Sequence, residues 1–165
     1  MQGILPHLLP ASLYALLGFH FWRTRWGRSA TKAPQGTLRW ERLALAVVLL
    51  LHGDVLYGEL FGGDGMRFGF SAALSLMLWL AVLIYWVESF YARLEGLQPL
   101  VLPLAAVCSL LPGLFPGQHL LANVTSAMFR AHFFIAMVAY SLFTLAALHA
   151  IIMAIAERRL HRGEL

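Results

Sequence analysis

Four polar side chains end a hydrophobic segment of this 165-residue chain. The segment VVLLLHGDVLYGELF starts at Val47 as an apolar run and then carries His52, Asp54, Tyr57 and Glu59. Ionisable residues inside a membrane span are costly, and they usually face the interior of a helix bundle or mark a functional path. His52 is the deepest of the four, about 14 Å from the end of the segment at 1.5 Å per residue. It is therefore the residue that most needs a partner.

The imidazole of His52 has two possible uses. Neutral imidazole is a common ligand of haem iron, which makes His52 a candidate axial ligand. A hydrogen bond to a neighbouring helix would satisfy the same ring without a cofactor. Glu59 follows seven positions later on nearly the same helical face, whereas Asp54 points away from it. Either carboxylate could lie at the membrane interface, orient His52, or pair with Arg67 or Arg130.

A second candidate, His132, opens the last hydrophobic segment just after Arg130. The helical face of His132 continues through the small residues Ala136, Ala139, Ala146 and Ala150. Phe143 is the one large residue on this face. Small residues allow close approach to a helix backbone. This face therefore predicts either helix packing or room for a flat macrocycle held by His132. A helix that started near Ser126 rather than Ala131 would place His132 about 10 Å deep, nearer the level of His52.

The remaining chemistry-bearing residues give weaker signals. We expect the other five histidines to be interfacial or packing residues; they are His7, His20, His119, His149 and His161. Of these, His119 is the best further candidate for an externally facing ligand. The single cysteine, Cys108, excludes a disulfide framework and a cysteine-based metal site. The sequence contains no Gly-rich phosphate loop, nucleophile elbow or zinc spacing. We therefore expect no catalytic residues and no enzymatic activity.

The composition is that of an integral membrane protein. The chain is 60% hydrophobic and 12% charged, whereas a soluble domain is about 45–50% apolar and about 25% charged. The length is typical of one domain, so residues 1–165 are expected to form a single unit. The net charge of +4 comes from residues between the hydrophobic segments, which argues against nucleic-acid binding. We expect an all-α, polytopic transmembrane helical bundle in a lipid bilayer.

Five segments approach the roughly 20 apolar residues that a spanning helix needs. They are residues 4–22, 43–61, 68–91, 97–114 and 131–156. Positive charges follow the first segment rather than precede it, so it is expected to be a retained span and not a cleaved signal peptide. Pro103 lies inside the fourth segment, where a proline removes a backbone donor and bends a helix. We expect this segment to pack centrally, because a bent span must satisfy its freed carbonyls inside the bundle.

Basic residues are distributed unevenly among the connections. They gather after the first, third and fifth segments, at Arg23, Arg25, Arg28, Lys32, Arg39, Arg42, Arg93, Arg158, Arg159 and Arg162. The other two connections hold only Arg67 and Arg130. Cytoplasmic loops of membrane proteins are enriched in Lys and Arg. The pattern predicts about five spans with the N-terminus outside and the C-terminus inside.

Two of these segments resemble a known family. HFFIAMVAYSLFTLAALHAIIMAIAERRLHR, which begins at His132, resembles the corresponding helix of the cytochrome c assembly family, the CcsA/CcmC-type haem handlers. LLLHGDVLYGELF resembles the second helix of the YpjD-like inner-membrane branch, with His52 at that helix's histidine, and LLPGLFPGQH fits the loop before the last span. Members of that branch have more spans than are expected here. The resemblance therefore implies a fragment or a shortened relative.

The resemblance implies a haem-handling protein of a bacterial inner membrane. His52 and His132 would be axial ligands to the iron of a non-covalent b-type haem, and the partners would be other cytochrome c maturation or membrane proteins. The residues themselves leave two alternatives open. One is a permease or transporter component in which the fourth segment and the outer acidic groups line a path. The other is a structural membrane subunit without a cofactor, which docks through the alanine face.

Overall fold

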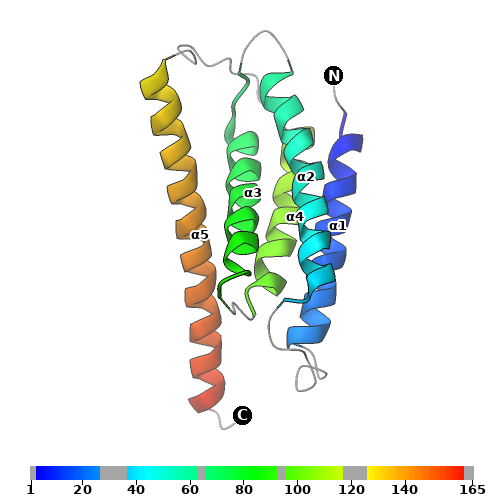
Figure 1. The fold of residues 1–165 in the computed structure, drawn as a ribbon, viewed down its shortest axis with the longest axis vertical. Coiled ribbons are helices and arrows are strands. Elements are labelled where there is room, and N and C mark those ends of the chain that lie inside the picture. The colour runs from blue at the N-terminus through cyan, green and yellow to red at the C-terminus, as the bar shows by residue number, and fades with distance from the viewer. Residues whose placement is uncertain (1–2, 27–36, 63–65, 93–95, 117–125, 162–165) are drawn as a thin grey trace.

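The computed structural model describes residues 3–26, 37–62, 66–92, 96–116 and 126–161. These residues form an all-helical bundle, with the helices alternating in direction along the chain (Figure 1). The elements are α1 (Leu5–Phe21), a π-helical turn η1 (Trp22–Trp26), α2 (Arg39–Phe61), α3 (Phe70–Glu88), α4 (Gln98–Leu114) and α5 (Ala127–His161). The five segments predicted from the sequence are therefore all helical.

Two helices start earlier than the apolar runs indicate, because polar groups cap their first turns. The Glu41 carboxylate accepts a hydrogen bond from the backbone N–H of Leu38 at 2.7 Å, so α2 begins at Arg39 rather than at residue 43. Ser126 accepts a hydrogen bond from the N–H of Phe129 through its hydroxyl, at 3.5 Å. This cap lets α5 begin at Ala127, as the alternative start near Ser126 predicts.

The packing divides the molecule into a compact body and one peripheral helix. Helices α1 to α4 pack on one another, and α4 lies against both α1 and α3, as predicted for the proline-containing segment. Gly18 of α1 brings the two backbones close at the proline of α4, because a Cβ added there would lie 3.1 Å from Pro103 Cδ. Helix α5 lies along α3 and extends beyond the other helices at its C-terminal end (Figure 1).

One apolar core fills the body. Tyr14, Phe21 and Leu45 are fully buried in it, together with Val82 and Leu102. Helix α5 reaches this core through a few residues only, of which Leu145 and Leu148 are buried. Burial of apolar side chains therefore contributes more to the packing of α1 to α4 on one another than to the packing of α5 on the body.

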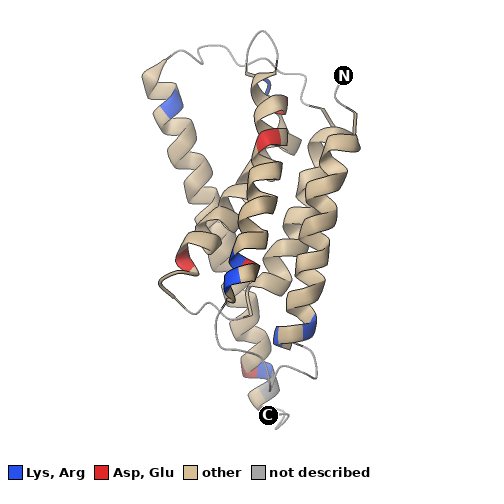
Figure 2. Cartoon of the chain, turned by 45° about the vertical axis from the view of Figure 1, so that its right-hand side comes forward, with Lys and Arg blue, Asp and Glu red and all other residues tan. Residues whose placement is uncertain are grey.

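The helices suit a membrane by length and composition. Within the described residues, three are long and apolar enough to cross a bilayer, namely α2, α3 and the stretch Ala127–Arg158 of α5. Helix α4 is apolar but shorter, with 17 residues. Figure 2 shows that the described charged residues lie mainly toward the two ends of the bundle, with largely uncharged helix between them. This distribution is the one that a hydrocarbon layer requires.

Candidate functional site

His52 lies in the centre of the four-helix body. Its side chain is completely buried. Nδ1 lies 3.3 Å from the Tyr14 hydroxyl of α1, and Nε2 lies 2.9 Å from the Ser75 hydroxyl of α3. The Tyr14 ring also packs edge-on against the imidazole, with ring centroids 5.5 Å apart. Each ring nitrogen therefore has a hydroxyl partner, so the structure gives His52 the hydrogen-bonded arrangement that was one of its two expected uses.

A second buried imidazole, His7, lies nearer the end of the bundle at which α1 begins and α2 ends. Its Nδ1 is 2.9 Å from the Ser109 carbonyl of α4, and its Nε2 is 3.3 Å from the Glu59 carboxylate of α2. A carbonyl only accepts, so Nδ1 carries a proton. A second proton must then lie between Nε2 and Glu59, on either the ring or the carboxyl group. His7 was expected to be an interfacial or a packing residue, and its side chain, which is only 1% exposed, is buried against α2 and α4.

His132 has the opposite environment. It is the sixth residue of α5, about 8 Å from the start of the helix, and its side chain is exposed. Ser141, which is buried and donates to the Met77 carbonyl of α3 at 2.9 Å, follows nine residues later. Nine residues are about 2.5 helical turns, so His132 faces away from the bundle. No described side chain hydrogen-bonds to it.

The alanine face of α5 is open as well. Ala146 and Ala150 are exposed, and Ala136 and Ala139 are partly so. Helix α5 instead packs on α3 through Ser141, Thr144 and the two buried leucines described above. The small residues are therefore not used for helix packing among the described residues. Because their side chains are short, the helix backbone is accessible beside His132 on the side that faces away from the bundle.

The structure does not bring His52 and His132 together. His52 is enclosed by α1 and α3, whereas His132 points outward from a helix that packs mainly on the other side of α3. Within the described ranges, no three His, Cys, Asp or Glu side chains are grouped so that they could hold a metal ion. A haem ligated by both imidazoles would therefore need a different arrangement of α5.

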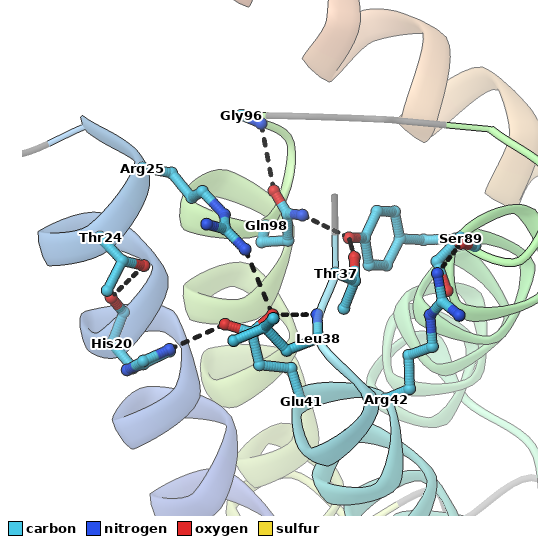
Figure 3. A network of polar contacts seen from close by, with 11 residues as sticks. His20, Thr24, Arg25, Thr37, Leu38, Glu41, Arg42, Ser89, Gly96 and Gln98 are labelled. Atoms are coloured by element: carbon cyan, nitrogen blue, oxygen red, sulfur yellow. Dashed lines mark hydrogen bonds and ion pairs between the residues drawn. The ribbon is translucent and has the colours of Figure 1, made fainter. Parts of the chain in front are cut away.

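A polar cluster lies at the opposite end of the body, where α1 ends and α2 begins, and sequence reasoning did not find it. The Glu41 side chain is 1% exposed, and its carboxylate meets His20 Nε2 at 3.0 Å and Arg25 at 3.2 Å (Figure 3). Gln98 of α4 donates to the Tyr85 hydroxyl in the same region. Because these residues come from α1, η1, α2, α3 and α4, the cluster fixes the ends of these elements to one another.

The other sequence candidates lie apart from His52. Glu59 pairs with His7 and does not hydrogen-bond to His52. Asp54 is exposed and lines a groove between α2 and α3 together with Tyr57. His149 borders a cavity between α3 and α5. His119 lies outside the described residues.

Comparison with known proteins adds no relative: no family model, no curated protein and no solved structure matches the chain.

Proposed function

We propose that this chain is a non-enzymatic haem-handling protein of the cytochrome c assembly type in a bacterial inner membrane. The sequence resemblance supplies the choice of haem as the ligand. The observation that carries the proposal is the environment of His132, an exposed imidazole on an apolar helix with no hydrogen bond to any described residue. An ionisable side chain at such a place in a membrane span is expected to have a function.

The open face around His132 suits a flat ligand. The neighbouring alanines are short, so a macrocycle could approach the α5 backbone closely. His132 would be an axial ligand of the iron, and the bound haem would supply the coordination chemistry. The exposed apolar side chains one helical turn away on the same side of α5, Met128 and Ile135, would exclude water from the ligand.

His52 is the second proposed ligand, and its hydrogen bonds set the condition for that role. Iron ligation would require that one ring nitrogen exchange its hydroxyl partner for the metal. The other nitrogen would keep its partner, as metal-ligating histidines usually do, and this bond would fix the orientation of the ring. Tyr14 and Ser75 are therefore proposed to hold the His52 imidazole together in the absence of the ligand, and one of them to hold it when iron is bound.

The proposed topology has five spans, with the N-terminus outside and the C-terminus inside. It is supported by the clustering of basic residues at one end, where α1 ends, α2 begins and α5 ends (Figures 1 and 2). In this orientation His132 lies near the outer face, where haem would be passed to a cytochrome. Single cysteines introduced at Gly3 and Glu157 into a Cys108→Ser background test the topology. A membrane-impermeant maleimide should label the first from outside and the second only after lysis.

A visible spectrum tests the haem proposal. Protein purified in detergent from haem-replete cells should show a Soret band, with split α and β bands after reduction. His132→Ala should abolish these bands, and His52→Ala should abolish or shift them. His149→Ala is the matched control, because His149 lies on the same helix and should leave the spectrum unchanged. A colourless wild-type protein would refute the proposal, and loss with His132→Ala alone would restrict His52 to a structural role.

The pairing of His7 with Glu59 favours a second candidate function, a component of a proton-coupled transporter. His7 Nε2 lies 3.3 Å from the Glu59 carboxylate, and the Glu59 side chain is 18% exposed. On α2, the buried residues between the level of His52 and that of Glu41 are apolar, namely Leu45, Val48 and Leu49. In this arrangement of the helices, the apolar residues would block proton exchange with the inner side, so the pair would exchange protons with the outer side only. Proton uptake into vesicles that contain the purified protein, reduced in Glu59→Gln, would support this function.

A further inference from the structure

A groove lies on the surface of α2 and α3. It has a volume of about 760 Å³. On α2 it extends from Ala46 to Phe61, which is about 22 Å at 1.5 Å per residue. Ligand pockets for small molecules fall in the range of about 300–1,000 Å³. The groove is therefore large enough for a drug-sized molecule.

Aromatic rings form much of its wall, and hydrogen bonds fix two of them. Trp79 Nε1 donates to the Leu49 carbonyl at 2.8 Å, and Trp86 Nε1 donates to the Arg42 carbonyl at 2.9 Å. Both indole N–H groups are thus used by the backbone of α2, and the rings offer the groove only their carbon surfaces. Tyr57 and Phe61 complete the aromatic lining.

A glycine allows this wall to lie against α2. A Cβ added at Gly53 would be 3.2 Å from Cζ2 of the Trp79 ring, so a larger residue would displace the indole. The Trp79 ring therefore lies directly beside the backbone at the position that precedes Asp54. The geometry places an aromatic surface and a carboxylate next to each other.

Among the described residues that line the groove, Asp54 is the only charged one. It lies seven residues before the end of α2, about 10 Å from that end. Its side chain is exposed, and no described side chain bonds to it. A carboxylate among apolar side chains at this depth needs a compensating positive charge. Aromatic faces attract cations for the same electrostatic reason, because the ring face is negative.

We infer that this groove binds a lipophilic cation, a molecule with a single ammonium-like or phosphonium-like centre on an apolar body. The cationic centre would pair with Asp54, and the apolar body would lie against Trp79, Trp86 and Tyr57. A basic side chain of a partner helix would satisfy the charge but would not make use of an apolar groove of this volume. This inference does not depend on haem binding, because neither His52 nor His132 lines the groove.

Tetraphenylphosphonium is a suitable probe, with tetraphenylborate as a matched anion of nearly the same shape. Calorimetric titration of the purified full chain in detergent should show saturable binding of the cation, with quenching of tryptophan fluorescence. Asp54→Asn should weaken binding about tenfold or more, which corresponds to about 1.4 kcal/mol or more. Asp54→Glu should retain it. Glu157→Gln, which removes an exposed carboxylate on α5, should leave binding unchanged.

Three results would overturn the inference. They are equal affinity of Asp54→Asn and wild type, equal affinity for the cation and the borate, and no binding of the cation to a wild-type protein that is monodisperse and folded. The unfolding temperature of Asp54→Asn, measured in the same detergent, shows whether lost binding reflects lost structure. If it does, Gly53→Val tests the groove instead, because it should displace Trp79 and weaken binding while Asp54 remains. Unchanged binding in that variant would also overturn the inference.

Discussion

His52 and His132 are both imidazoles on apolar helices, yet the structure treats them in opposite ways. His52 is completely buried and has a hydroxyl at each ring nitrogen. His132 is exposed, faces away from the bundle and has no described hydrogen-bond partner. The same contrast extends to their surroundings, since α1 to α4 share one core and α5 contacts mainly α3. The imidazole of His52 is satisfied by side chains within the body, whereas the imidazole of His132 on α5 has no hydrogen bond to any described residue.

The largest effect on stability is expected from Glu41→Ala, in the polar cluster where α1 ends and α2 begins. The substitution removes the carboxylate from a nearly buried Arg25 and from the backbone N–H of Leu38. Breaking a buried pair by removing one partner costs about 3–5 kcal/mol. The unfolding temperature in detergent should fall on the order of 10 °C. Glu157→Ala, at an exposed position of α5, should change it by no more than a degree or two; equal shifts would contradict the division into body and periphery.

His52→Ala should also destabilise the body. It leaves the buried Tyr14 and Ser75 hydroxyls without their partner, at about 1–3 kcal/mol for each group left unpaired. Thermal unfolding followed by near-UV circular dichroism would measure the loss. Ser75→Ala removes one of the two bonds and should give a smaller loss. If His52→Ala were neutral, the two hydroxyls would not depend on the imidazole.

The tight contact between α1 and α4 can be compared with the open face of α5 by adding volume to each. Gly18→Val should cost about 1–3 kcal/mol, because its Cβ would lie 3.1 Å from the ring of Pro103. Ala146→Val adds two methyl groups at an exposed position and should change stability by less than about 0.5 kcal/mol. Urea or detergent titration of both variants measures the difference. A large cost at Ala146 would show that the alanine face is packed in the purified protein.

The smallest effect on stability is expected from His132→Ala, below about 0.5 kcal/mol, since the side chain is exposed and makes no described hydrogen bond. Differential scanning fluorimetry in parallel with the haem spectrum would separate the two readouts. The haem proposal expects the spectrum to change while the apoprotein melts normally. An apoprotein that melts much earlier would place His132 in the packing of α5 instead.

The sequence predicts the five helices well, because each depends on a long apolar run that only a helix can present to lipid. Their starts were predicted less well, by four residues in α2 and in α5, because capping by Glu41 and Ser126 extends each helix beyond its apolar run. The depth of His52 within its segment correctly indicated burial. Its contacts could not be predicted, because they depend on which helices become neighbours.

His7 shows how the missed part of the site could have been found. It lies only three residues into the first predicted segment, which indicated an interfacial position. However, His7, Tyr14 and Phe21 follow one another at intervals of seven residues and share a helical face, and all three are buried. Glu59 has the same spacing from His52. Two such series on consecutive helices indicate a shared interface, even though they do not identify which side chains touch.

The length of α5 has a consequence for the bilayer itself. Its 35 residues extend about 52 Å, whereas the 19 residues of α3 extend about 28 Å, close to the roughly 30 Å of a hydrocarbon core. A membrane whose thickness matches α3 cannot also match an upright α5. Hydrophobic mismatch therefore requires α5 to tilt or to carry its last turns into the headgroup region. The thickness of the bilayer is thus one of the factors that determine the angle between α5 and the body.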